Sequence, residues 1–346
     1  MKNKILVSVA VASLFLSSCK KPFSVNAPYE DFPIVIGLLN ASEQTHYIKV
    51  YKSFVTEHNA YDAAKDIDLY SYIDSIDVYV EERNASNVLV RTIRFDTTTE
   101  IPKNQGVFAY PTQIIYKADA VLNENYKYKL FVYNRYTKKM ATSKEVLLAG
   151  NVNVRRPSAS QVFPVITIND NALPIEYFSA KNTSLYDFTI TYYYSEQLND
   201  NSLRQGNPIV WYMGEQTHQT TTSGLLSFSV GSGTPFYQKI ASGIIEDENV
   251  IARRTDSIVL TVSTAARDWY LYLLASRPSS GLNQNRLDYS NISAYDVDNG
   301  KVKYAMGIFS SRNNTMKMFR DLAEPASRDS LFHGRFTGHL KFTDIY

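Results

Sequence analysis

The sequence of 346 residues is poor in the residues that most often identify a chemical function. It contains one cysteine, 14 glycines, 12 prolines and five histidines. A single cysteine excludes an internal disulfide framework, and the low glycine and proline content argues against a disordered chain. Lysine and arginine total 36 and aspartate and glutamate total 34. Because neither sign of charge is in excess, we expect no nucleic-acid partner.

The sequence also lacks the motifs of common catalytic and cofactor sites. No two histidines are four residues apart, and no HExxH, Gly-x-Ser-x-Gly, Walker or dinucleotide-binding motif occurs. We therefore predict no catalytic residue, no metal ligand and no cofactor. The densest acidic run, Glu246-Asp247-Glu248, keeps open a hydrolase with an unrecognised carboxylate site, since two carboxylates across a cleft need no fixed spacing in the sequence.

A long apolar run occurs only at the start of the chain. Lys2 and Lys4 precede the apolar segment 5–16, and Leu16-Ser17-Ser18-Cys19 follows it. A basic start, a short apolar run and small residues before a cut site predict a signal peptide over 1–18. The run is shorter than the roughly 20 apolar residues of a membrane-spanning helix. Leu-Ser-Ser-Cys matches the lipobox of lipoprotein signal peptides, so we predict that cleavage exposes Cys19.

The predicted modification at Cys19 is a thioether-linked diacylglyceryl group, with palmitate as a typical acyl chain. Each buried CH₂ of such a chain contributes about 0.8 kcal/mol, so two or three chains hold a protein on a membrane. Residues 19–32 then form a lipidated tether. Lys20 follows the cysteine where aspartate would favour the inner membrane, so we expect a lipid-anchored envelope protein of the outer membrane. Its periplasmic or surface orientation stays open.

Apolar and polar residues alternate along most of the remaining chain, which predicts β-strands. The segments 74–80 and 126–132 show this most clearly. A polar break at 151–157 divides the chain into an N-terminal Ig-like β-sandwich over 33–154 and a second β-rich domain over 155–346. One helix is expected near 264–276, starting at Ser263 or Thr264 and packed on the second sheet.

Further elements are predicted from the same patterns. A short surface helix is expected within 62–72. Other strands are expected at 46–52, 88–95, 113–116, 162–168, 185–194, 209–213, 225–230, 258–263 and 340–342.

The order of these features resembles a family of Bacteroidota outer-membrane lipoproteins of unknown function. The resemblance rests on the lipobox and on segments 34–40, 76–80 and 126–132, followed by a Trp269-Tyr270-Leu271 helix and, last, the segment 306–311. It implies a domain-of-unknown-function lipoprotein whose relatives are often encoded beside TonB-dependent receptors. It implies no catalytic residues.

Two groups of side chains are candidate sites. Aromatic residues can stack on sugar rings or fill a partner's groove, and Trp211, Tyr212 and Tyr193 form the candidate platform. The pattern Asp, then Ser or Thr, then Ile, Leu or Thr resembles an O-glycosylation acceptor of Bacteroidota envelope proteins. Its candidate acceptors are Ser75, Thr97, Ser257 and Ser330.

Together these observations predict a membrane-anchored, non-enzymatic binding or accessory subunit. The expected partners are membrane lipid through Cys19 and an outer-membrane receptor such as a TonB-dependent transporter. A surface module that binds glycan through exposed aromatics is the first alternative, and the hydrolase is the second.

Overall fold

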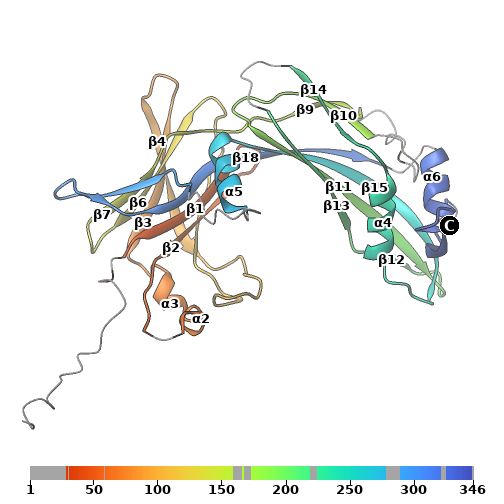
Figure 1. The fold of residues 1–346 in the computed structure, drawn as a ribbon, viewed down its shortest axis with the longest axis horizontal. Helices are drawn as coiled ribbons and strands as arrows, with labels where there is room; N and C mark the ends of the chain where they lie inside the picture. Colours follow the sequence, from red (N-terminus) through yellow and green to blue (C-terminus); the bar gives the residue numbers. More distant parts are fainter. Residues whose placement is uncertain are drawn as a thin grey trace, which may run out of the picture.

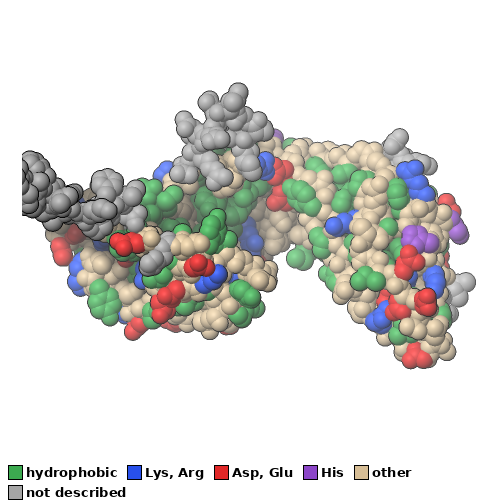
Figure 2. Space-filling model, turned by 60° about the horizontal axis from the view of Figure 1, so that its bottom comes forward, with side chains coloured by type: hydrophobic (Ala, Val, Ile, Leu, Met, Phe, Trp, Pro, Cys, Tyr) green, Lys and Arg blue, Asp and Glu red, His purple; other side chains and the backbone are tan. Residues whose placement is uncertain are grey.

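The computed structural model describes residues 29, 31–57, 59–158, 166, 173–218, 224–277, 289–320 and 325–344. The predicted all-β class is confirmed, because strands dominate this part of the chain. Two lobes lie side by side and are joined by long strands (Figure 1). A second view shows open space between the lobes beneath those strands (Figure 2). The molecule therefore has the shape of an arch.

The first lobe is a two-layered β-sandwich. One layer contains β1 (Pro33–Asn40), β2 (Thr45–Lys52), β5 (Ile115–Asp119) and the first half of β18 (Met306–Phe319). The other contains β3 (Ile76–Arg83), β6 (Lys127–Asn134), β7 (Lys139–Ser143), β8 (Val146–Leu147), β16 (Ile292–Asp296) and β17 (Val302–Lys303). Strand β4 (Leu89–Thr98) pairs with both β3 and β5, so it continues from one layer into the other.

The core of this lobe follows from the alternation in its sequence. Successive side chains of a strand point to opposite faces. Val78 and Val80 of β3 and Leu130 of β6 therefore face inward, where they meet Val35 and Phe309 from the opposite layer. The intervening residues of β3 and β6 are partly exposed, as the alternation predicted.

The second lobe is built on one long antiparallel layer. This layer contains β11 (Leu185–Leu198), β12 (Leu203–Gln205), β13 (Ile209–Thr217), β15 (Val250–Ala265) and the second half of β18. Its inner face is covered by a small sheet and three short helices. They are β9 (Asn153–Arg156), β10 (Leu173–Phe178), β14 (Leu225–Val230), α4 (Thr234–Gly243), α6 (Pro325–Phe332) and the 3₁₀ helix η1 (Gly338–Leu340).

Strand β18 belongs to both lobes. Met306 to Arg312 pair in parallel with β1, and Arg312 to Phe319 pair antiparallel with β15. Strand β16 likewise returns to the first lobe and pairs with β7. The predicted division into 33–154 and 155–346 is thus incomplete, because residues 292–312 complete the first sandwich. Such pairing between distant segments leaves no local pattern in the sequence.

The segment 147–154 crosses from the first lobe to the second along the inner face of β18. Four β18 side chains at every second position bond its backbone, with donor–acceptor distances between 2.5 and 3.3 Å. They are Ser311, Asn313, Thr315 and Lys317. Residues 148–152 of this crossover segment lie in no strand, so these side chains satisfy backbone groups that would otherwise be buried without hydrogen bonds.

Several predicted boundaries differ in the structure. Helix α5 spans Arg267–Ser276, its N-cap is Ala266, and none of its residues is fully buried. The expected caps Ser263 and Thr264 instead continue β15, since both pair with β11 and β18. The expected strand 340–342 is the end of η1 followed by a single bridge from Phe342 to Arg253.

The expected surface helix within 62–72 is two short helices, α2 (Ala60–Ala63) and α3 (Ile67–Tyr70). Most of the expected strand 162–168 lies outside the described residues.

Gly307 allows β18 to approach β1. A Cβ atom there would lie 1.9 Å from the carbonyl oxygen of Val35, and its φ is +123°. We predict that Gly307→Ala lowers the free energy of unfolding by more than about 4 kcal/mol, because backbone must move. Gly300→Ala is the matched control, with φ +68° and open space around its Cβ, and should cost about 1–2 kcal/mol. Urea unfolding followed by circular dichroism measures both, and equal losses would refute the steric explanation.

Candidate functional site

The outer face of the second lobe's sheet carries rows of side chains that are aligned across four strands. Cross-strand partners in a sheet project to the same face. The register places Val210, Thr191, Val259 and Met318 in one row. The next row contains Tyr212, Thr189, Thr261 and Met316. We call these eight residues, together with Tyr193, the outer-face patch.

The outer-face patch is apolar or hydroxyl-bearing, and none of its nine residues carries a charge at neutral pH. Met316 and Met318 are 65% and 64% exposed, which is high for such apolar side chains. Val210 and Tyr212 are about half exposed. Methionine side chains are flexible and polarizable, and they recur at protein-binding surfaces. Exposed apolar side chains gathered on one face are typical of an interaction site.

A shallow hollow of about 700 Å³ adjoins one end of the patch. Tyr193, Val259 and Met318 line it together with Leu203 of β12 and with Asp256. Asp256 accepts hydrogen bonds from Ser195 at 2.8 Å and from Gln205 at 3.0 Å. The hollow is thus lined by both apolar and polar side chains, as protein-binding surfaces commonly are.

The other end of the patch is acidic. Tyr212 donates a hydrogen bond to Asp187 at 3.3 Å, and Arg277 pairs with Glu215 at 2.5 Å. Burial and the neighbouring Glu215 raise the pKa of Asp187. Burial and the Asp187 carboxylate raise the pKa of Tyr212 to about 12, so its hydroxyl remains a hydrogen-bond donor at neutral pH.

The structure separates the three residues of the candidate aromatic platform. Trp211 is only 7% exposed, and its ring packs against Phe236 of α4 at 5.7 Å. The inclusion of Trp211 is therefore wrong, because neighbours in a strand point to opposite faces. Tyr212 and Tyr193 do share the outer face, but Tyr212 pairs with Thr189, four positions before Tyr193. That separation is about 13 Å along the strand, so the two rings form no continuous platform.

The four candidate acceptors of O-glycans differ in exposure. Thr97 is exposed, and Ser75 and Ser257 are partly exposed. Ser330 lies buried in α6, where its carbonyl accepts a hydrogen bond from Thr337 at 3.2 Å. A glycan at Ser330 is therefore contradicted by burial. Cys19 lies outside the described residues.

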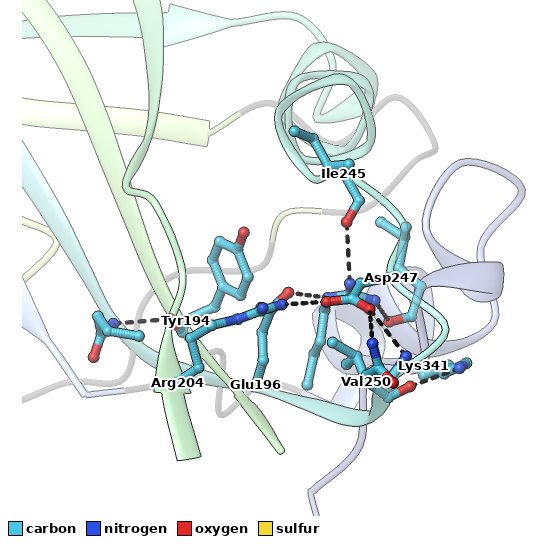
Figure 3. A network of polar contacts seen from close by, with 11 residues as sticks. Tyr194, Glu196, Arg204, Ile245, Asp247, Val250 and Lys341 are labelled. Atoms are coloured by element: carbon cyan, nitrogen blue, oxygen red, sulfur yellow. Dashed lines mark hydrogen bonds and ion pairs between the residues drawn. The ribbon is translucent and has the colours of Figure 1, made fainter. Parts of the chain in front are cut away.

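A network of charged residues occupies the far end of the second lobe (Figure 3). Glu196 accepts hydrogen bonds from Arg253 at 2.9 Å and from Arg204 at 2.8 Å, and Arg204 also pairs with Asp247 at 2.9 Å. Arg253 is 2% exposed and donates to the carbonyl of Leu340 at 2.7 Å. The network thereby fastens the C-terminal segment to the sheet.

This network adjoins a hollow of about 670 Å³, which is also lined by the acidic run 246–248. Hydrogen bonds from Asn249 and Arg204 lower the pKa of Asp247, so this carboxyl is ionised at neutral pH. Both oxygens of Glu196 already accept from arginines. These two carboxylates are held in structural contacts, and the pKa of Asp247 is lowered, whereas a general acid needs a raised one.

Within the ranges that the structure describes, no group of three or more His, Cys, Asp or Glu side chains could hold a metal ion. No helix in that part of the chain is long and apolar enough to cross a membrane.

Comparisons with known proteins do not identify this chain. No family model matches it, and no curated protein matches it. Among solved structures, it is similar to the C-terminal globular domain of an oligosaccharyltransferase from Pyrococcus abyssi, with 10% identity and a TM-score of 0.26. The likeness covers 66% of this chain and 46% of that chain, so this chain spans less than half the length of that structure. A likeness this low carries no argument about function.

Met316 and Met318 were missed by the sequence analysis. Segment 313–319 reads Asn-Asn-Thr-Met-Lys-Met-Phe, and both methionines alternate with residues that face the crossover segment. The usual reading of alternation places the apolar residues inside. That rule fails for this half of β18, because Thr315 and Lys317 occupy its inner face. Their side chains form hydrogen bonds with the backbone of the crossover segment.

Arg253 offers a direct test of the charged network. We predict that Arg253→Leu lowers the free energy of unfolding by about 3–5 kcal/mol, because it removes one partner of a buried ion pair and releases the C-terminal segment. Its exposed neighbour Arg254 is the matched control, and Arg254→Leu should cost less than about 1 kcal/mol. Urea unfolding of both variants gives the comparison, and similar losses would contradict the proposed role.

Proposed function

We propose that this protein is a lipid-anchored, non-enzymatic binding or accessory subunit of an outer-membrane protein, with a TonB-dependent transporter as the partner class. The observation that carries the proposal is the outer-face patch, which is uncharged and is most exposed at Met316 and Met318 on β18. A flat apolar face fits a protein partner better than a small molecule, because small-molecule sites are usually enclosed clefts.

The sequence supports the anchor in this proposal. Leu16-Ser17-Ser18-Cys19 has the spacing of a lipobox, and Cys19 is the only cysteine of the chain. Confinement to a membrane raises the effective concentration of a binding module near a membrane partner. A patch of modest affinity can then hold its partner.

The first test concerns the anchor. In a bacterial host fed an alkyne-tagged fatty acid, we expect the wild-type chain to incorporate the label. Cys19→Ser should remain unlabelled and accumulate as an uncleaved precursor, since serine lacks the thiol that accepts the diacylglyceryl group. Ser17→Ala preserves a small residue and should behave as wild type. An unlabelled wild-type chain would refute the anchor.

The second test concerns the partner surface. We expect the lipidated protein, isolated from detergent-solubilised membranes of its own host, to carry a membrane receptor in a constant molar ratio. The double variant Met316→Lys, Met318→Lys should lose the receptor, because two charges would be buried at the interface without partners. Ile245→Lys is the control, since Ile245 is 86% exposed and lies outside the patch.

Two results would contradict the proposed surface. One is recovery of the wild-type protein alone. The other is undiminished recovery of the receptor by the double variant, which would assign binding to another face.

A further inference from the structure

Two excursions of the first lobe pack together into a single projection. The first is 53–73, which contains α2 and α3, and the second is the loop 99–112. The amide of Ala109 donates to the carbonyl of Ala64 at 3.0 Å and joins them. We call these two segments the basal knob.

Aromatic rings hold the basal knob against β2. The ring of Tyr70 lies 5.1 Å from that of Phe108 and 5.9 Å from that of Tyr51. Two ammonium groups lie over this cluster, Lys49 at 4.7 Å from the Tyr51 ring and Lys103 at 4.8 Å from the Phe108 ring. These ring–ring and ammonium–ring contacts hold the basal knob in one position against β2.

The basal knob exposes an unusual number of large apolar side chains. Tyr61 of α2 is 68% exposed. Seven others in these two segments are also exposed: Val55, Leu69, Ile73, Ile101, Val107, Phe108 and Tyr110. They come from both excursions, so the apolar character belongs to the knob as a whole. Clusters of this kind mark contact with another apolar phase or a partner.

The described chain begins beside the basal knob. Tyr29 donates a hydrogen bond to the carbonyl of Ser53 at 2.6 Å, and the amide of Ser53 donates to Phe32 at 3.0 Å. Tyr72, two residues after the end of α3, donates to Asp31 at 2.9 Å. The start of β1 and helices α2 and α3 lie at the same end of the first lobe (Figure 1).

We propose that the basal knob rests in the interface of the lipid bilayer to which Cys19 is anchored. This inference depends on the lipid anchor of the proposed function. Cys19 lies ten residues before Tyr29, and ten residues span at most about 35 Å. The anchor therefore keeps this end of the first lobe near the membrane, whereas the outer-face patch belongs to the other lobe.

The exposed apolar and aromatic side chains of the basal knob fit the zone between lipid headgroups and acyl chains. Tyrosine is enriched at that depth because its ring is apolar and its hydroxyl is polar. Lysine stems can lie along apolar surface while the ammonium reaches the headgroups. Contact at two points, lipid chain and knob, would fix the orientation of the arch on the membrane.

Site-directed labelling can test the position of the basal knob. The predicted thioether blocks Cys19, the only natural thiol, so an introduced cysteine takes a nitroxide label at one place. The lipidated variants Tyr61→Cys and Val107→Cys report the two excursions. Ile245→Cys is the matched control because it is 86% exposed and lies in the second lobe. Each variant is reconstituted alone in vesicles of phosphatidylethanolamine and phosphatidylglycerol.

The measurement compares relaxation of the label by oxygen, which partitions into the bilayer, with relaxation by a water-soluble nickel complex. We expect labels at 61 and 107 to show oxygen-dominated relaxation and the label at 245 to show nickel-dominated relaxation. Chains that float with the vesicles but keep both knob labels nickel-accessible would overturn the inference and leave the anchor intact. Oxygen-dominated relaxation at all three positions would also overturn it, since the knob would then have no special role.

A separate outcome identifies failure of the proposed function. Chains that carry no fatty acid and do not float with the vesicles would overturn the anchor and this inference together.

Discussion

The structure depends on strand β18 and on the hydrogen bonds that its inner face makes with the crossover segment. Ser311, Asn313, Thr315 and Lys317 occupy inner positions that would ordinarily be apolar. An unsatisfied buried backbone group costs about 1–3 kcal/mol, and residues 148–152 of the crossover segment lie in no strand. Polar side chains on β18 remove that cost. They also fix the path by which the chain enters the second lobe. Both lobes are thereby attached to the same strand, β18.

The two faces of the second lobe's layer use their side chains in opposite ways. The inner face buries Glu196 and Arg253, whose hydrogen bonds hold the C-terminal segment against the sheet. A buried ion pair adds little net stability compared with apolar packing, but removal of one partner is strongly destabilising. The outer-face patch has no charge that would oppose desolvation by a partner. Charge therefore secures the fold on the inner face, and on the outer face it borders the patch without lying within it.

Local pattern accounts for much of the fold and for little of the site. Alternation identified β3 and β6, because each has one buried apolar face and one polar face. It could not show that β16 and β18 complete the first sandwich, since their partners β7 and β1 lie more than 100 residues earlier. Helix propensity placed α5 correctly but began it too early, because β pairing of Thr264 outweighs its value as a cap. Trp211 was read as exposed because composition does not reveal which face of β13 is covered, and here α4 covers it.

The shared strand also governs the order in which the molecule can be completed during biosynthesis. A ribosome releases β1 and β7 early, yet their missing neighbours β18 and β16 come from residues 292–312. Until nearly the whole chain has emerged, the first sandwich keeps two open edges, and open edges readily pair with other chains. Nascent molecules of this protein should therefore need a chaperone's protection until the last sixth of the polypeptide has been delivered.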